Sequence, residues 1–231
     1  MKLRELIEFS NGRLIGEADL EKEISKFSID SRIVDDSTFF IPLKGENSDG
    51  HDYINSAFEK GAIGTFTSKE IDAIPEKVII KVDDTLVAMQ NVAKKLREKI
   101  KNIPLIAITG SVGKTTTKDM VYAVLNSKYR TLKTRGNFNN NIGMPLTLIN
   151  YANEEAIVLE MGMNHFGEIS FLSGIAKPDT AIIINVGHSH IGNLGSRENI
   201  LKAKMEIVDG MTNDGTLVIN GDNDMLKTVK N

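Results

Sequence analysis

A stretch rich in glycine and hydroxyl side chains carries the plainest chemical signal of the chain. Residues 109–117 read TGSVGKTTT and follow the apolar run Leu105–Ile108. A strand, a glycine loop and a helix start in this order surround an anion with backbone N–H groups, and the helix dipole adds to them. Lys114 would reach the phosphates and Thr115 would bind Mg²⁺. ATP or GTP is therefore expected at Gly110, Ser111, Val112, Gly113, Lys114, Thr115 and Thr116.

This loop departs from the common phosphate-loop pattern at one position. The pattern has glycine five residues before Gly113, where this chain has Ile108. We therefore predict a shorter variant of the loop. The alternative is an ordinary strand-to-helix turn that happens to contain Gly-Lys-Thr.

Two further polar clusters follow apolar runs that predict strands. Residues 136–145 read GNFNNNIGMP, and their amides offer donors and acceptors that suit a substrate beside a phosphate. The alternative is a plain turn, because asparagine is common in turns. Glu160 follows the apolar residues 157–159, where a carboxylate can coordinate Mg²⁺ directly or through water. The alternative is a glutamate at a strand end that faces solvent.

A loop with two histidines forms the last cluster. Residues 185–190 read NVGHSH, and Lys204 lies in the helical pattern that follows. His190 could bind a second metal ion through a neutral imidazole, whereas His188 is expected to pack or to cap the loop. Taken alone, these histidines do not separate a metal ligand from a loop residue, and Lys204 alone indicates a lysine on a helix surface.

Alternating apolar runs predict the elements that position these clusters. From residue 105 onward, short β-like runs alternate with helical patterns, which indicates a doubly wound, mostly parallel α/β sheet. Ligands of such sheets bind beyond the carboxyl ends of the strands, where all four clusters fall. The strands are expected at Leu105–Thr109, Thr131–Lys133, Ile157–Met161, Ala181–Val186 and Thr216–Ile219. The helices are expected at Thr116–Leu125, Ile142–Ile149, Gly167–Ala176 and Arg197–Met211.

Residues 1–82 contain short, mixed segments instead of this regular alternation, and they predict a small, separate α/β domain. Strands are expected at Thr38–Leu43 and Val78–Val82, and a helix at Tyr53–Lys60. The amphipathic stretch Thr85–Ile100 is interpreted as a helix that leads into the second domain, with a solvated lysine-rich face. The predicted domains are therefore residues 1–82 and 83–231.

Charge and composition limit the class of protein. The formal net charge is −3 and the pI is near 5.9, which argues against nucleic acid as a partner. The sequence has no cysteine, which excludes disulfides and thiolate metal ligands and fits a reducing compartment. No leader pattern and no apolar run of about 18 residues occurs. We therefore expect a cytoplasmic protein that does not insert into a membrane.

Taken together, the motifs resemble the Mur ligase family in their spacing and order. The resemblance implies a small N-terminal α/β UDP-binding domain and a central P-loop ATPase-type domain. Residues 160–164 followed by 167–169 resemble the members that add D-alanyl-D-alanine. The matching segments are 109–117, 136–145, 160–164 with 167–169, and 190–207 in the second domain, and 30–32, 39–45 and 49–51 in the first.

The resemblance implies an ATP-dependent amide ligase of peptidoglycan precursor synthesis. ATP would phosphorylate the terminal carboxylate of UDP-N-acetylmuramoyl-tripeptide, and the amine of D-alanyl-D-alanine would displace phosphate from the acyl phosphate. Lys114, His190 and Lys204 would be catalytic, with Lys204 matching a lysine that the family carries as a carbamate. Thr115 and Glu160 would hold one Mg²⁺, and His190 would help to hold a second. The implied substrate contacts are Ser31, Arg32, Lys44, Gly45, His51, Asn137, Asn140 and Asn141.

Two departures from the family change what is expected of these residues. Gly192 stands where the family usually has an acidic residue. The chain ends at Asn231, ahead of the rest of the central domain and of the family's third domain, so we expect a monomeric fragment that binds nucleotide weakly and does not ligate alone. The alternatives are another Mur or folylpolyglutamate-synthase-like ligase, and a noncatalytic P-loop NTPase that works as a switch.

Overall fold

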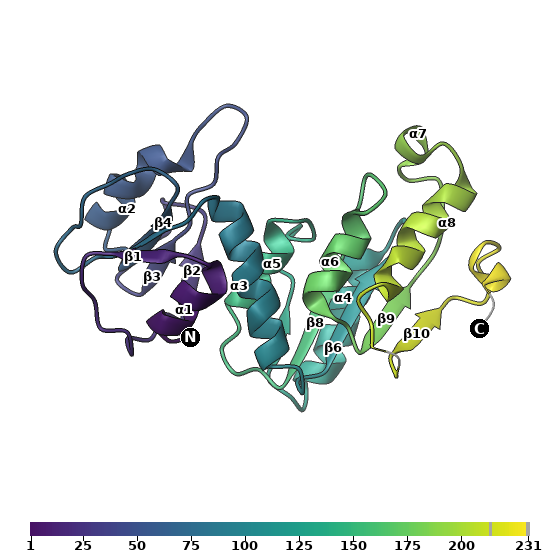
Figure 1. The fold of residues 1–231 in the computed structure, drawn as a ribbon. Coiled ribbons are helices and arrows are strands. Elements are labelled where there is room, and N and C mark those ends of the chain that lie inside the picture. The colour runs from purple at the N-terminus through teal and green to yellow at the C-terminus, as the bar shows by residue number, and fades with distance from the viewer. Residues whose placement is uncertain (213, 230–231) are drawn as a thin grey trace. The chain divides into compact units, whose positions relative to one another are not determined.

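The chain folds into two compact units, which a computed structural model describes for residues 1–212 and 214–229 (Figure 1). Unit 1 comprises residues 1–96 and 148–152, and unit 2 comprises residues 97–147 and the described residues from 153 onward. The expected boundary at 82/83 lies ahead of α3 (Thr85–Lys99), whereas the units divide inside this helix. The first turn of α3 stays with unit 1 because the Thr85 hydroxyl donates to the carbonyl of Pro42.

Unit 1 is built on a five-stranded sheet in the order β1-β5-β4-β3-β2, in which only the pairing of β1 with β5 is antiparallel. Phe39 lies at its centre, with ring centroids 5.0 Å from Phe66 and 5.8 Å from Phe27. The sequence pattern located β3, β5 and α2 but missed the other elements. The bounds are α1 Leu3–Ser10, β1 Arg13–Ile15, β2 Lys26–Ser28, β3 Thr38–Phe40, η1 Gly50–Tyr53, α2 Ile54–Glu59, β4 Gly64–Thr67 and β5 Val78–Lys81.

The segment 148–152 completes the edge of this sheet. The side-chain oxygen of Asn150 accepts from the backbone N–H of Phe27 at 2.9 Å, and its amide nitrogen donates to the Phe27 carbonyl at 3.1 Å. One side chain thus replaces a neighbouring strand at the outer side of β2, whose backbone groups would otherwise remain unpaired.

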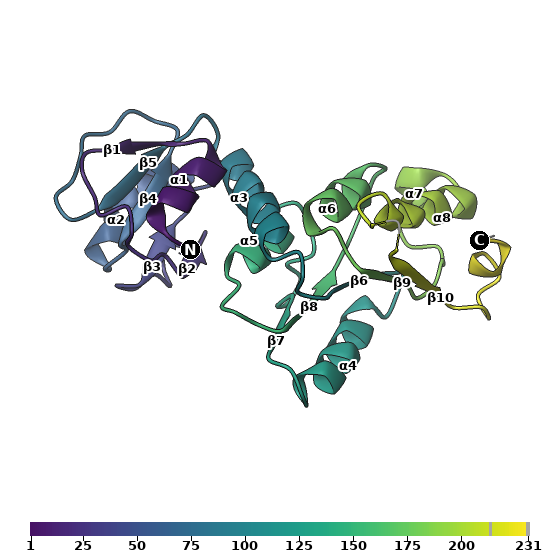
Figure 2. The same cartoon turned by 60° about the horizontal axis from the view of Figure 1, so that its bottom comes forward.

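Unit 2 is a parallel sheet in the order β10-β9-β6-β8-β7, which confirms the predicted α/β class. Figure 2 shows α4 on one face of this sheet and α6 and α8 on the other. The strand bounds are β6 Leu105–Thr109, β7 Thr131–Lys133, β8 Ala156–Glu160, β9 Thr180–Ile183 and β10 Thr216–Ile219. The helices are α4 Lys114–Asn126, α5 Gly143–Ile149, α6 Glu168–Ala176, α7 Ile191–Leu194 and α8 Arg197–Met205, with η2 Glu206–Val208 and η3 Leu226–Thr228.

Two expected elements of unit 2 were too long. The strand expected over residues 181–186 ends at Ile183, and beyond it the side chain of Asn185 bonds the loop after β6. The helix expected over residues 197–211 ends at Met205 and tightens into η2, where Glu206 accepts hydrogen bonds from the start of α6. No helix in the described part of the chain is both long and apolar enough to cross a membrane.

Arg97 links the last turn of α3 to the end of the unit 2 sheet at which β6 begins. Its side chain is 2% exposed, and burial lowers the pKa of its guanidinium. The Asp179 carboxylate that it binds also accepts from the N–H of Leu105, at the start of β6. The guanidinium donates to the carbonyls of Ile100, Ile103, Ala176 and Lys177 and to Asp179 at 2.7–3.1 Å.

Candidate functional site

The loop between β6 and α4 presents a row of unpaired backbone donors. Gly113, the N-cap of α4, has φ 81°, a left-handed conformation that glycine adopts without strain. The N–H of Thr117 donates to the Gly113 carbonyl at 2.9 Å. The N–H groups of Gly113, Lys114, Thr115 and Thr116 have no acceptor among the described residues. Four free N–H groups at the start of a 13-residue helix form an anion site.

Lys114 and Thr115 stand at this helix start with defined partners. The ammonium of Lys114 donates to the carbonyl of Gly110 at 2.9 Å, which folds the side chain over the loop. The hydroxyl of Thr115 donates to Glu160 at 2.9 Å. The structure therefore brings the glycine loop and the end of β8 together, as the sequence predicted for strand-end clusters.

Glu160 ends β8, a strand in which all five residues are buried, and is itself 2% exposed. The alternative of a solvent-facing glutamate is therefore wrong. One carboxylate oxygen accepts from Thr115, the other accepts from the Asn139 amide at 2.7 Å, and the backbone N–H donates to the Thr134 hydroxyl at 2.9 Å. Neither Asn139 nor Thr134 was among the predicted site residues, although Asn139 belongs to the asparagine run.

Lys204 is buried in α8 with 1% of its surface exposed, so the alternative of a helix-surface lysine is wrong. Its ammonium has no hydrogen bond or ion pair within residues 1–212 and 214–229. Burial, and after it the positive charge of Lys114, lower the pKa of Lys204 to about 8. A buried lysine in this state holds a larger share of neutral, nucleophilic amine than an exposed one.

His190 lies beside both lysines at the N-cap of α7, with φ 67°. Burial first, and then the charges of Lys204 and Lys114, lower its pKa, while Glu168 acts in the opposite direction. The imidazole is therefore held in the neutral form that can bind a metal. The charge of Lys114 thus affects the pKa of both Lys204 and His190, and the charge of Lys204 affects the pKa of His190. The three predicted catalytic side chains therefore lie close enough to interact electrostatically.

The asparagine loop divides its side chains between two tasks. The oxygen of Asn140 accepts from the N–H groups of Ile142 and Gly143 at 3.2 and 2.8 Å, which caps the start of α5. Asn139 binds Glu160, while Asn137, Asn140 and Asn141 are exposed. Of the three asparagines predicted to bind substrate, Asn140 thus has its oxygen engaged within the protein.

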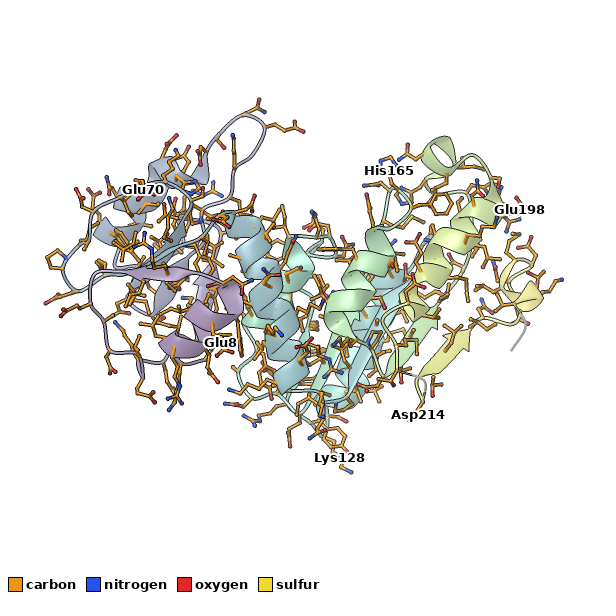
Figure 3. The ribbon with its side chains drawn as sticks, viewed as in Figure 1. Glu8, Glu70, Lys128, His165, Glu198 and Asp214 are labelled. Carbon is orange, nitrogen blue, oxygen red and sulfur yellow. The ribbon has the colours of Figure 1, made fainter. Side chains whose placement is uncertain are left out.

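The start of α6 is fixed by a residue that sequence reasoning missed. The Glu206 carboxylate accepts from the N–H of Gly167 at 2.8 and 3.0 Å and from that of Ser170 at 3.3 Å. Glu168, the first residue of α6, accepts from the N–H of Asn164 at 2.7 Å. Figure 3 labels the exposed His165 in the loop between β8 and α6 that these contacts hold.

In unit 1, the predicted phosphate contact Arg32 already has a partner. Its Nε and Nη2 groups donate to the two Asp30 oxygens at 2.9 and 2.7 Å, although 82% of the Arg32 side chain is exposed. This pairing lowers the pKa of Asp30 to about 2. The neighbouring Ser31 carbonyl accepts from Lys60 at 3.3 Å. A phosphate would therefore meet an arginine that is held in place, with its remaining donors free.

His51 is largely buried and has partners at both ring nitrogens. Its Nδ1 lies 2.6 Å from Asp49, its Nε2 accepts from the N–H of Ser68 at 3.0 Å, and its side chain is 5% exposed. Lys44 and Gly45, in contrast, lie in an exposed turn. His51 also lines a cavity of about 320 Å³ together with Ile54, Asn55, Thr67, Lys69, Ile71, Asp72 and Ile74.

The donor set around Glu160 fits Mg²⁺. No group of three or more His, Cys, Asp or Glu side chains able to hold a metal occurs among the described residues. Thr115 and Glu160 nevertheless place two hard oxygen donors 2.9 Å apart beside the free N–H groups of α4. Mg²⁺ commonly binds proteins through one or two such ligands and completes its shell with water and phosphate oxygens.

Comparisons with known proteins point to one family. Residues 108–231 match the Mur ligase middle domain, and residues 23–104 match the catalytic domain of the Mur ligase family. The UDP-N-acetylmuramoyl-tripeptide--D-alanyl-D-alanine ligase of Bacillus subtilis is 44% identical over 97% of this chain and 50% of its own length. That of Escherichia coli is 35% identical over 96% of this chain and 48% of its own length.

Solved structures agree with these relatives. A crystal structure of MurF from Acinetobacter baumannii superposes with a TM-score of 0.87 at 34% identity, covering 97% of this chain and 49% of that protein. MurF from Thermotoga maritima in complex with ADP superposes with a TM-score of 0.76 at 33% identity, over 88% of this chain and 47% of that protein. This chain thus spans about half the length of the relatives that it matches. With its parallel sheet, phosphate loop and both matching segments, the chain belongs to the Mur ligase family.

Proposed function

We propose that the chain supplies the UDP-substrate and ATP sites of a ligase that joins D-alanyl-D-alanine to UDP-N-acetylmuramoyl-tripeptide. The observation that carries the proposal is the contact between Thr115 and buried Glu160 beside four free N–H groups at the start of α4. The relatives in Bacillus subtilis and Escherichia coli bear the name of this activity. A cytoplasmic, monomeric protein is part of the proposal.

In the proposed reaction, the side chains of unit 2 neutralise and orient the phosphates of ATP. The free N–H groups and Lys114 hold the β- and γ-phosphates, so that the substrate carboxylate can attack the γ-phosphorus and ADP leaves. Thr115 and Glu160 would hold Mg²⁺, which supplies charge neutralisation on the transferring phosphoryl group when bound. His190 would serve a second metal ion as a neutral imidazole.

Lys204 would act as a carbamate. The neutral form of its buried amine, whose pKa is lowered to about 8, can add to CO₂. The ammonium loses one proton before the C–N bond forms and the nitrogen loses a second afterwards, so the cation becomes an anionic carbamate. An anion at this position offsets the charge of Lys114 or of a bound metal. A carbamate would explain why a lysine that has no acidic partner among the described residues is buried.

In unit 1, we propose that the residues after the parallel strands hold the UDP end of the substrate. Ser31 and Arg32 follow β2, and Lys44 and Gly45 follow β3, so they share the carboxyl edge of the sheet. His51 would act indirectly, by fixing the turn that carries Asp49. Asn137, Asn140 and Asn141 would contact the substrate in unit 2, Asn140 through its amide nitrogen because its oxygen accepts hydrogen bonds within the loop.

Binding and ligation are tested separately. Calorimetric titration of this chain with ADP and with UDP-N-acetylmuramoyl-tripeptide tests the two sites. Ligation is tested in a chimera in which residues 1–231 replace the matching half of the Bacillus subtilis relative. We expect phosphate release and a product of the correct mass with D-alanyl-D-alanine and not with single amino acids. Binding of ADP without binding of the UDP-substrate would favour a P-loop switch, and ligation of a single amino acid would indicate another ligase specificity.

A further inference from the structure

The side chain of Asn185 is bonded to the phosphate loop of the neighbouring strand. Asn185 follows β9, which pairs with β6. Its side-chain oxygen accepts from the N–H groups of Ser111 and Val112, both at 3.1 Å. Its amide nitrogen donates to the Val112 carbonyl at 3.0 Å. One amide thus uses both its acceptor and its donor capacity on two consecutive loop residues.

The rest of the loop after β9 strengthens this connection through Ser111. The N–H of Gly187 donates to the Ser111 hydroxyl at 2.9 Å, and the hydroxyl of Ser189 donates to the Ser111 carbonyl at 3.3 Å. The N–H of Ser111 also donates to the Asn185 carbonyl at 3.1 Å. Every polar group of Ser111 therefore has a partner in residues 185–189, and the residue is 7% exposed.

These contacts divide the loop into a braced part and an open part. The N–H groups of Ser111 and Val112 are occupied by Asn185, whereas the four that follow, from Gly113 to Thr116, have no acceptor among the described residues. The loop lacks the early glycine of the common pattern. The residue at that position is Ile108, which is fully buried in β6. A short loop of this kind needs another means of holding its shape, and the Asn185 amide supplies one.

We propose that Asn185 is a positioning residue for nucleotide binding, which holds Ser111 and Val112 so that the next four N–H groups converge on the phosphates. The inference rests on the proposed nucleotide site. Preorganised donors bind an anion more tightly because the loop does not have to be ordered on binding. Because His190 lies in the same segment, five residues after Asn185, the brace also joins the phosphate loop to the histidine loop.

The test compares Asn185→Ala and Asn185→Asp with matched changes at Asn126. Asn126 ends α4, about 20 Å from the phosphate loop at 1.5 Å per residue, and its side-chain oxygen likewise accepts one backbone N–H, that of Thr131. ADP is the probe, and calorimetry measures its dissociation constant. We expect Asn185→Ala to raise this constant about tenfold, the equivalent of one lost net hydrogen bond or slightly more. The Asn126 variants are expected to stay within about twofold, since no nucleotide contact is changed.

The aspartate variant separates bracing from charge. Asn185→Asp keeps the acceptor for both N–H groups but loses the donor to Val112 and adds a negative charge beside the phosphates. We expect it to bind ADP more weakly than Asn185→Ala at low salt, with the difference shrinking as salt screens the repulsion. Equal affinities of the two variants at low salt would contradict this placement of Asn185.

Hydrogen exchange without nucleotide tests the brace directly. In Asn185→Ala, we expect the amide of Val112, which loses its acceptor, to exchange at least about tenfold faster, while the β6 amides keep their protection. The Ser111 amide keeps the backbone carbonyl of residue 185 as an acceptor and should change less. Unchanged exchange at the Val112 amide, or unchanged ADP affinity of the alanine variant, would overturn the role of Asn185. If the unaltered chain failed to bind ADP, the proposed nucleotide site would fall and this inference with it, even where the exchange data confirmed the brace.

Discussion

Replacing Lys204 with methionine is expected to stabilise the fold at neutral pH. Lys204 is 1% exposed and has no acidic partner among the described residues, so its charge is held in an unfavourable place. Methionine has a similar length, is apolar and adapts to irregular spaces. The substitution removes the cost of burying the ammonium and retains most of the packing.

The magnitude follows from the difference between the folded and unfolded pKa of this lysine. Burial lowers the pKa from 10.5 to about 8, so the unfolded chain binds more protons than the folded chain between these values. The stability of the unaltered protein therefore rises with pH across this window. Relative to a neutral amine, the cost is about 3 kcal/mol at pH 7 and about 1 kcal/mol at pH 9.5. The advantage of Lys204→Met should thus shrink by about 2 kcal/mol between these two pH values.

Urea unfolding followed by circular dichroism at pH 7 and pH 9.5 measures this change, in buffer depleted of CO₂ so that Lys204 stays an unmodified amine. Lys202→Met is the matched control, because Lys202 lies on the same helix but is exposed. An equal stability difference between Lys204→Met and the unaltered protein at both pH values would refute the reasoning, as would destabilisation at pH 7. Under the proposed function, the more stable variant should lose ligation in the chimera described above, since Lys204 serves the reaction rather than the fold.

Three further substitutions test other parts of the structure. Glu160→Gln should weaken ADP binding about tenfold in the presence of Mg²⁺ and less than about twofold in its absence. Calorimetry with and without Mg²⁺ measures both losses, and equal losses would contradict the role of Glu160 in metal binding. Arg97→Lys replaces five N–H donors by three and leaves buried carbonyls unpaired, so the free energy of unfolding, measured by urea titration, should fall by about 2–4 kcal/mol. A loss below about 0.5 kcal/mol would show that the Arg97 hydrogen bonds do not stabilise unit 2. Arg32→Lys should weaken binding of the UDP-substrate severalfold and leave ADP binding unchanged, because a lysine cannot pair with Asp30 and a phosphate through a planar fork; a loss of ADP binding would show a wider defect.

The strands of unit 2 were predictable because their sequence signals are local. Leu105–Thr109 and Thr216–Ile219 appear with the expected bounds, since each is a compact apolar run between turn residues. The strands of unit 1 were harder to predict. β1 and β2, which the sequence pattern missed, have three residues each, too few to establish an alternating pattern.

The sequence predicted those neighbours in the site that lie at the ends of adjacent strands, but not those whose contacts depend on the path of a loop. Lys114 and Glu160 follow neighbouring parallel strands, so topology alone brings them together. The choice of Asn139 over Asn140 as the partner of Glu160 depends on the backbone path of the loop, which three adjacent amides do not reveal. Glu206 binds Gly167 across 39 positions of sequence, and no local pattern announces such a contact.

The Asn150 contact with β2 has a consequence for the order in which the chain folds during synthesis. Phe27 leaves the ribosome long before its partner Asn150, which lies 123 positions later. By then, β6, α4 and β7 of the other unit have already been translated. The N-terminal unit therefore cannot finish folding before its successor has started. Folding of the two units is interleaved on the nascent chain, and a stalled ribosome that has released fewer than 150 residues should display a first unit with a frayed outer edge.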